Sequence, residues 1–173
     1  TKCIRFYLLA ILDKKKMKKH HLLWVLICIS GSLFAQRATT QYDVIKTAQE
    51  WKKSLNELEY YVLREQGTER PFSSPLLKIK TSGTYVCKGC KTPLFKSEHK
   101  FDSGTGWPSF DREIKGNVGY GTDYKAGYAR SEEYCLNCGG HLGHVFTDGP
   151  KNTTGLRHCI NGAALEFIPD SSK

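Results

Sequence analysis

Two closely spaced pairs of cysteines constrain this chain more than any other feature. They read CKGC (87–90) and CLNC (135–138) and lie far apart in the sequence. Each C-x2-C turn can present two sulfurs on the same side, and two such turns supply the four thiolates of a tetrahedral Zn(II) site. We therefore expect one structural zinc ion, bound by Cys87, Cys90, Cys135 and Cys138. A closed four-cysteine site leaves no position for a substrate, so we expect this metal to hold the fold together.

Two other interpretations of the paired cysteines stay open. The pairs could form disulfides if the protein works in an oxidising compartment. They could also be thioredoxin-like redox pairs, although no alternating strand and helix pattern supports that reading. Zinc is favoured because four sulfurs complete its coordination.

A leader precedes the part of the chain that carries these motifs. From Met17 the sequence reads MKKHHLLWVLICISGSLFAQ, a positive stretch, an apolar run and small residues, which is the pattern of a secretory signal peptide. We expect residues 1–35 to be this leader, with cleavage after Ala35 and export to the periplasm or another extracytoplasmic compartment. The apolar run is shorter than the roughly 20 residues that span a bilayer, and an uncleaved membrane anchor is the alternative.

The charge of the chain is concentrated in the same leader. The formal net charge is +9, but lysines and arginines of residues 1–35 account for most of the excess. The remainder is too mildly basic to indicate a nucleic-acid partner. We expect residues 36–46 to form a flexible terminus and residues 47–170 to form a single domain.

The domain begins with a helical pattern and continues with strand patterns. Thr47 and Glu50 fit a capping box, and Trp51, Leu55 and Leu58 follow on one helical face, which predicts a helix over 48–59. After residue 83, short segments rich in β-branched and aromatic residues are separated by turn residues. These segments are TYVC, YARSEEYC, HVF, LRHCI and ALEFI. The pattern predicts a mainly β domain behind a short helical segment.

A fifth cysteine outside the leader, Cys159, has no partner nearby in the chain. It lies in LRHCIN, where an extended strand would place Arg157, Cys159 and Asn161 on one face and turn His158 away. A nearby cation lowers the pKa of a thiol and favours the nucleophilic thiolate. The alternative is an inert buried cysteine on a core strand.

Two further stretches favour a functional interpretation of Cys159. HLGHVFTDGP (141–150) places His141, His144 and Asp148 close together, a composition suited to proton transfer. FDSGTGWPSF (101–110) presents Trp107 on a loop rich in glycine and proline. The face of Trp107 could bind a methyl or sulfur group, or the ring could belong to the core.

These motifs resemble a known family. KFDSGTGWPSF, HLGHVFTDGP and LRHCINGAALEF, together with the two cysteine pairs in this order, are similar to the B-type, R-stereospecific peptide-methionine sulfoxide reductases. The similarity extends through EWKKSLNELEYYVLREQGTERPF and PLFKS and covers roughly residues 47–168. It implies a mainly antiparallel β fold behind short N-terminal helices, stabilised by zinc on the paired cysteines.

The resemblance also implies a site and a reaction. Cys159 would be the nucleophile, with His144 and Asp148 as its catalytic partners. Trp107 would pack on the methyl group of the substrate, and the other substrate-binding positions would be His141, Arg157 and Asn161. The thiolate would attack the sulfoxide sulfur of a methionine-R-sulfoxide residue in an oxidised protein. A protonated histidine would supply the proton, and Cys159 would become a sulfenic acid.

The chain departs from the family pattern at three positions. Many members carry a resolving cysteine where this chain has Thr105, so we expect an external thiol, from a thioredoxin-like protein, to reduce Cys159. Use of a zinc-binding cysteine is the alternative. His158 replaces the usual Tyr and Gly162 the usual Ser, and neither supplies a reacting group. We expect a monomer.

Two rival functions remain to be distinguished at this point. The chain could be a zinc-stabilised binding module without activity, in which case replacing Cys159 would change nothing. It could also be a Cys–His thiol hydrolase, which would not respond to sulfoxides and would need an oxyanion hole.

Overall fold

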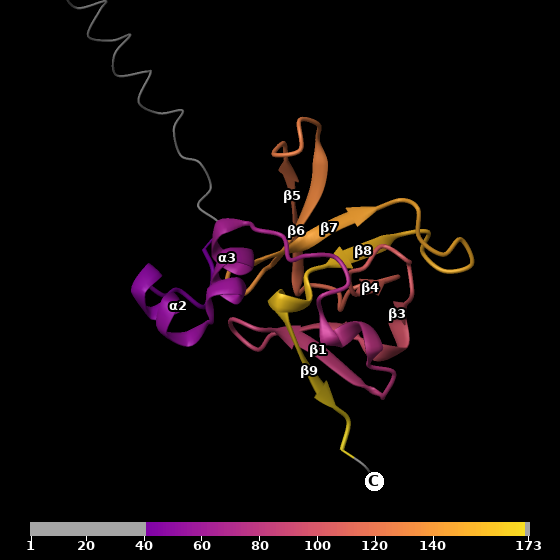
Figure 1. The fold of residues 1–173 in the computed structure, drawn as a ribbon, viewed down its shortest axis with the longest axis horizontal. Coiled ribbons are helices and arrows are strands. Elements are labelled where there is room, and N and C mark those ends of the chain that lie inside the picture. Colours follow the sequence, from indigo (N-terminus) through magenta and orange to yellow (C-terminus); the bar gives the residue numbers. More distant parts are fainter. Residues whose placement is uncertain (1–40, 172–173) are drawn as a thin grey trace, which may run out of the picture. The chain divides into compact units, whose positions relative to one another are not determined.

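The structure, a computed structural model, describes residues 41–171, and the predicted leader (1–35) lies outside this range. The described chain begins with two short helices, α2 (Ala48–Ser54) and α3 (Glu57–Glu65), and continues into strands (Figure 1). Over residues 41–171, no helix is both long and apolar enough to cross a membrane.

The helical segment differs from the single helix predicted over 48–59. Thr47 and Glu50 form the expected capping box at the start of α2, but Asn56 and Glu59 form a second one at the start of α3. The Asn56 side chain accepts a hydrogen bond from Glu59 N, and the Glu59 carboxylate accepts one from Asn56 N, each at 2.9 Å. Because an N-cap residue takes an extended conformation, the helix breaks there. Leu58 therefore leaves the face of Trp51 and is 46% exposed.

The strands form two antiparallel sheets, as the expected mainly β class requires. The smaller sheet has the order β2-β1-β9, built from β1 (Gly83–Cys87), β2 (Pro93–Lys96) and β9 (Leu165–Pro169). The larger sheet has the order β3-β4-β8-β7-β6-β5. Its strands are β3 (Lys100–Phe101), β4 (Ser109–Phe110), β5 (Val118–Asp123), β6 (Arg130–Cys135), β7 (His141–Phe146) and β8 (Arg157–Ile160).

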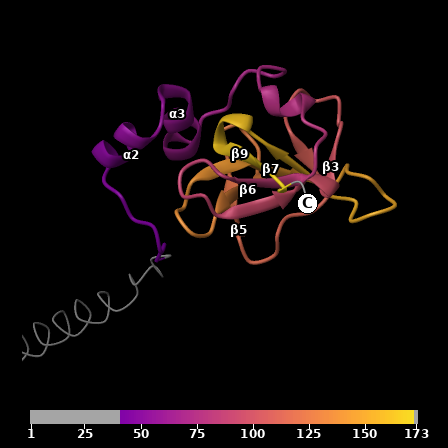
Figure 2. The same ribbon diagram turned by 90° about the horizontal axis from the view of Figure 1, so that it is seen from below.

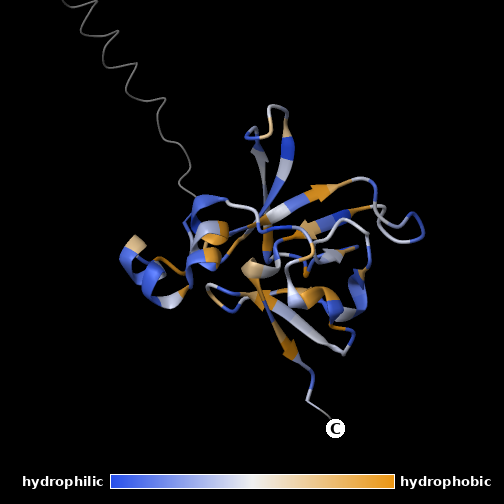
Figure 3. Ribbon diagram, viewed as in Figure 1, coloured by the Kyte–Doolittle hydropathy of each residue, from blue (hydrophilic) through white to orange (hydrophobic). Residues whose placement is uncertain are grey.

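Aromatic residues from both sheets fill the core. Phe95 of β2 stacks on Phe110 of β4 with ring centroids 4.4 Å apart, and Tyr85 of β1 meets the same Phe110 edge-on at 5.0 Å. These three side chains are fully buried. Figure 3 shows the apolar residues gathered on the central strands, whereas the β5–β6 hairpin is mostly polar. The contact across Phe110 is what fixes the two sheets against each other.

The two helices lie beside one another at one side of the strands, as Figures 1 and 2 show. Trp51 of α2 and Leu63 of α3 join the core and are almost fully buried. The 3₁₀ turn Pro75–Lys78 lies between α3 and β1, Ser97–His99 links β2 to β3, and Gly162–Ala164 links β8 to β9. The helices thus cover the end of the sheets where the cysteine pairs lie.

Candidate active site and cysteine cluster

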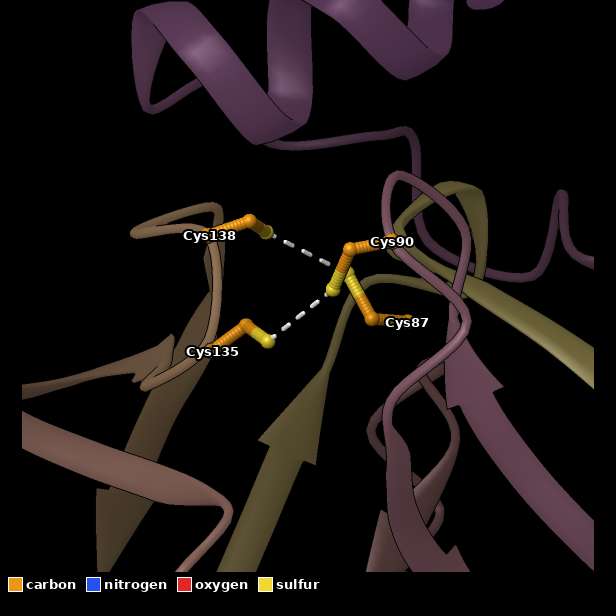
Figure 4. A group of neighbouring side chains, drawn as sticks. All are labelled: Cys87, Cys90, Cys135 and Cys138. Atoms are coloured by element: carbon orange, nitrogen blue, oxygen red, sulfur yellow. Dashed lines mark hydrogen bonds between the residues drawn. The ribbon is translucent and has the colours of Figure 1, made fainter. Parts of the chain in front are cut away.

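The four paired cysteines converge on one point between the two sheets (Figure 4). Cys87 ends β1 of the smaller sheet and Cys135 ends β6 of the larger one. The sulfur of Cys87 is 3.7 Å from that of Cys138, and the sulfur of Cys90 is 3.5 Å from that of Cys135. All four ligand atoms lie within 4.8 Å of one another. The cluster therefore connects the sheets at the turns of two hairpins.

These sulfur distances fit a metal site better than disulfides. A disulfide needs about 2.05 Å between sulfurs, and the four residues are free thiols. A tetrahedron with ~2.3 Å metal–sulfur bonds has edges of about 3.8 Å, close to the two shorter distances. Hydrogen bonds among the thiols lower the pKa of Cys90 and raise the pKa of Cys87, in both cases led by the hydrogen bond with Cys135. The disulfide alternative is not what the structure shows.

Each cysteine turn is closed in the same way. Lys91 N donates to Cys87 O and Gly139 N donates to Cys135 O, both at 2.8 Å. The two donor residues have left-handed φ values of 64° and 69°. Glycine takes this conformation without strain, whereas Lys91 is held in it by the turn. The two turns are thus equivalent halves of one cage.

The N-terminal segment packs over this cage. Arg64 of α3 donates to Cys138 O at 2.9 Å, and the Trp51 ring lies against Gly89 of the first turn. Val44 N donates to Asn137 O at 2.9 Å, and the ring of Tyr42 lies against Gly139. Residues 42 and 44, at the end of the predicted flexible terminus, therefore contact the second turn.

A second group of side chains lies in a row across the larger sheet. The strand register places Ser109 opposite Cys159, Cys159 opposite His144, and His144 opposite Glu132. Residues directly opposite each other in antiparallel strands project from the same face. The register thus brings Cys159 and His144, which are distant in the sequence, side by side.

Cys159 lies on β8 and is partly exposed. Its sulfur is 3.9 Å from Oγ1 of Thr105, which is hydrogen bonded to Ser103 at 2.8 Å. Burial raises the pKa of the Cys159 thiol above its ordinary value and outweighs the opposite effects of Thr105 and Arg157. The free thiol is consequently the protonated, resting form at neutral pH.

Arg157 shares the face of Cys159 but is engaged elsewhere. Its guanidinium donates two hydrogen bonds of 2.9 Å to the carboxylate of Asp148 and lies 4.4 Å above the ring of Phe146. The Asp148 side chain is 64% exposed, and the hydrogen bond from Arg157 lowers its pKa. Asp148 therefore orients Arg157, whose charge acts on the thiol.

The two histidines of β7 are each held by a carboxylate that the sequence did not identify. His144 Nε2 is 2.8 Å from Asp123 Oδ2, and Arg130 binds the same oxygen at 2.6 Å. His141 Nδ1 is 2.6 Å from Glu132 Oε1. The rings of the two histidines meet edge-on at 5.4 Å.

Burial and hydrogen bonding set the charge of the His144–Asp123 pair. Desolvation lowers the pKa of His144 despite its contact with Asp123. Hydrogen bonds from the Lys125 backbone, His144 and Arg130 hold the pKa of Asp123 well below its usual range. Asp123 is thus ionised while the resting imidazole is neutral, which leaves His144 able to take up a proton.

Asn161 and Trp107 meet at Glu69, a residue that the sequence did not single out. Asn161 follows the end of β8, where its side-chain oxygen accepts from Glu69 N at 3.0 Å and its amide donates to Leu142 O at 2.9 Å. Trp107 Nε1 donates to Glu69 O at 3.2 Å. The buried Glu69 carboxylate accepts hydrogen bonds from Gly162 and Ala163 N–H groups. The backbone thus takes up much of the hydrogen-bonding capacity of the Asn161 amide.

His158 faces the opposite side of β8, as the strand alternation predicts. It is fully buried, and its Nδ1 is 2.6 Å from Oε1 of Glu133, itself fully buried. Gly143 lies opposite Glu133 on one side and Ile160 on the other, and His158 lies opposite Val145, so Glu133 reaches diagonally across β7 to the imidazole. The pair secures β8 from behind the thiol.

No spacing rule identifies Asp123, Glu132 and Glu69 in the sequence. Asp123 and Glu132 reach the histidines because β5 and β6 pair with β7 in one register. The hairpin of β5 and β6 is rich in glycine and tyrosine, and its charged residues resemble the sequence of an exposed loop. The one local indication is RSEEYC, because alternation along a strand places its two adjacent glutamates on opposite faces of the sheet.

Comparisons with known proteins place the chain among sequences of one family. The SelR domain model matches residues 55–169. A peptide methionine sulfoxide reductase MsrB of Bradyrhizobium diazoefficiens is 49% identical over 136 residues, covering 78% of this chain and 97% of the relative. One of Alteromonas mediterranea is 53% identical over 119 residues (68% and 83%), and one of Leptospira interrogans is 50% identical over 127 residues (73% and 96%).

Proposed function

The chain belongs to the MsrB family of peptide methionine sulfoxide reductases, and from this premise we propose that it reduces the R epimer of methionine sulfoxide in oxidised proteins. Members of this family are oxidoreductases. The observation that carries the proposal is the register of β8 on β7, which sets the free thiol of Cys159 beside His144 on one face. A nucleophile and a proton carrier are the two groups that sulfoxide reduction needs.

The first step of the proposed reaction is proton transfer within this pair. Because burial favours neutral Cys159 and neutral His144, the reactive form is the ion pair made when the thiol proton moves to the imidazole. Arg157 stabilises the thiolate, and Asp123 stabilises the imidazolium. The two charges favour each other, so the ion pair is accessible although each group alone prefers to be neutral.

The second step transfers oxygen. The Cys159 thiolate attacks the sulfoxide sulfur while His144 donates its proton to the sulfoxide oxygen. The attack forms a bond between the two sulfurs. The hydroxyl then moves from the methionine sulfur to the Cys159 sulfur, the sulfur–sulfur bond breaks with its electron pair on methionine, and Cys159 is left as a sulfenic acid. The methionine sulfur gains two electrons and the cysteine sulfur loses them. Trp107 binds the methyl group and His141 contacts the polar part of the substrate, while Asn161 holds Glu69, whose carbonyl accepts the Trp107 ring N–H.

An external thiol completes the cycle. Thr105 stands 3.9 Å from the Cys159 sulfur, where a hydroxyl cannot form a disulfide. A thiol of a thioredoxin-like protein attacks the sulfenic acid, releases water and forms a mixed disulfide. Its second thiol then frees Cys159 and leaves as a disulfide. The cysteines of the cluster stay out of this exchange.

The four-cysteine cluster binds one zinc ion in this proposal. The sulfur distances and the burial of Cys87, Cys135 and Cys138 fit a closed structural site. When bound, the metal neutralises the thiolates and holds the two hairpin turns together. Export of the chain through a signal peptide in residues 17–35 is the remaining part of the proposal, and it rests on the sequence alone.

The test is turnover of the two epimers of methionine sulfoxide in a peptide, with dithiothreitol as reductant. Wild type should reduce the R epimer only, and Cys159→Ser should lose this turnover while it keeps its circular dichroism spectrum. A folded wild type that reduces neither epimer would show that the proposed reaction is wrong. Turnover that survives Cys159→Ser would assign the nucleophile to another residue.

A further inference from the structure

The loop that carries Thr105 and Trp107 also forms one wall of a pocket that the proposed reaction does not use. This pocket has a volume of about 460 Å³, and its apolar lining includes Phe72, Leu77, Ile79, Phe101, Trp107 and Pro108. We call it the Trp107 pocket. Trp107 lines this pocket and also belongs to the proposed methyl-binding site, so the two sites share this ring.

The segment opposite Trp107 is held against its loop by the backbone. Phe72 N donates to Gly106 O at 2.7 Å, and Gly106 has a φ of +92°. A Cβ at Gly106 would lie 2.9 Å from both the backbone nitrogen and the ring of Phe72. Glycine at this position is therefore what lets the two segments approach.

Phe72 is an unusual residue at the rim of this pocket. It is 71% exposed and has a left-handed φ of 63°, which a bulky side chain rarely adopts. Such strain persists only where the surroundings enforce it, and it gathers at binding sites. The Phe72 ring lines the pocket in this conformation, which places it to contact a ligand bound there.

The opposite wall is anchored by a partly buried cation. Lys100 Nζ donates to Leu77 O at 3.0 Å and to Ile79 O at 3.1 Å, which orders the segment carrying both apolar side chains. Asp102 accepts from Gly104 N and so remains part of the loop structure. Ser97 accepts from Gly83 N, so Ser97, Lys100 and Asp102 are engaged within the fold, whereas Lys80 of the same lining is exposed. The apolar side chains form the rest of the surface that the pocket offers an occupant.

We propose that the Trp107 pocket is a subsite for the polypeptide substrate and binds a large apolar side chain within two residues of the oxidised methionine. In an extended peptide, side chains two residues apart project from the same face about 7 Å from each other. A substrate with its methyl group on Trp107 can therefore place a neighbouring side chain against Phe72 and Ile79. This inference rests on the proposed function and restricts its substrates to unfolded or exposed protein segments with an apolar neighbour.

The experiment compares peptides that carry methionine-R-sulfoxide in a glycine background, with one phenylalanine at position −2, −1, +1 or +2. At one or more of these positions, phenylalanine should raise kcat/KM about 10-fold over glycine, mainly through KM, because the ring leaves water on binding. If no position raises it more than about 2-fold, the subsite does not exist.

Variants locate the effect. The ratio of kcat/KM for the preferred phenylalanine peptide over the all-glycine peptide should fall towards one in Ile79→Glu and in Phe72→Ala. Leu58→Ala, which removes a similarly large and partly exposed side chain from α3, should keep the wild-type ratio. A ratio that is unchanged in both pocket variants would overturn the proposal. The ratio cancels any general loss of activity in a less stable variant.

Free methionine-R-sulfoxide separates this inference from the proposed function. It carries no neighbouring side chain, so its turnover tests the reaction alone. Turnover of the free amino acid without any preference among the peptides contradicts only the subsite. The absence of turnover with free amino acid and peptides alike contradicts both.

Discussion

The cysteine cluster and the Cys159 site use the same side chain in opposite ways. In the cluster, four sulfurs lie within 4.8 Å of one another, enclosed by two tight turns and covered by the N-terminal helices. Within residues 41–171, Cys159 lies apart from the other cysteines and has hydroxyl, imidazole and guanidinium groups as neighbours. A thiol surrounded by thiols holds structure, whereas a thiol surrounded by proton carriers is suited to react.

The largest expected effect comes from breaking the cluster. Cys135→Ser should lose the metal and with it the folded state, because structural zinc contributes on the order of 10 kcal/mol, as much as the whole stability of a domain. The metal-to-protein ratio and the circular dichroism spectrum measure this. A Cys135→Ser variant that stays folded without metal would show that the cysteine cluster does not stabilise the fold, and the contrast with the Cys159 site would be wrong.

Cys159→Ser is the matched control for that variant. It exchanges the same atoms at the other site, and it should keep the metal content and the thermal midpoint of wild type.

The next effect belongs to the proton carrier. His144→Gln should lower kcat/KM about 10²- to 10⁴-fold, the usual contribution of a positioned acid or base, with a small change in the thermal midpoint. Steady-state kinetics on a methionine-R-sulfoxide peptide provide the measurement. A loss of less than about 3-fold would assign proton transfer to another group, and His141→Gln would then be compared.

The pH profile sharpens this assignment. The pKa of His144 is below its ordinary value, so protonation of His144 should reduce kcat/KM of wild type only below about pH 6.5. The pKa of Cys159 is above its ordinary value, so loss of the thiol proton should reduce kcat/KM only above about pH 8.5. Asp123 raises the pKa of His144, so Asp123→Asn should move the acidic limb to still lower pH and reduce kcat/KM at pH 7 on the order of 10-fold. An acidic limb that moves to higher pH would contradict the pairing of His144 with Asp123.

The smallest effect lies in the helices that cover the cluster. Asn56→Ala removes the capping box that starts α3 and should cost about 1 kcal/mol in the free energy of unfolding, with kcat/KM unchanged. Urea unfolding and kinetics test the two statements together. A reduced kcat/KM in this variant would mean that the helices support the reaction as well as the fold.

The sequence predicted what local patterns encode. The five strand segments expected after residue 83 all occur as β1, β6, β7, β8 and β9, and the mainly β class is confirmed. Strand β2 was missed because PLFK is short and opens with proline. Strands β3 and β4 were missed because two residues carry no period, and β5 because VGYGTD is rich in glycine. The helix break at Asn56 was missed because apolar spacing continues across it, although the second capping box was present in the letters N-E-L-E.

The cysteine pairs and Cys159 could be identified because their chemistry lies in consecutive residues. The carboxylates that hold the histidines could not, because Asp123 and Glu132 meet them only through pairing between strands. From the sequence alone, Asn161 was expected to have a free side-chain amide. Its hydrogen bond with Glu69 N could not be predicted, because Glu69 lies nearly a hundred residues earlier in the chain. Which residues face each other across a sheet depends on the strand register, and the register cannot be read from the sequence of a single chain.

The alternation of β8 has a consequence for folding errors. If this strand paired one residue out of step, His158 would turn outward and Cys159 would enter the core beside Phe95 and Phe110. The slipped strand would leave the Glu133 carboxylate buried without its partner, a cost of several kcal/mol. The His158–Glu133 pair thus favours the correct register of β8, because a misaligned strand with an unreactive site would be less stable.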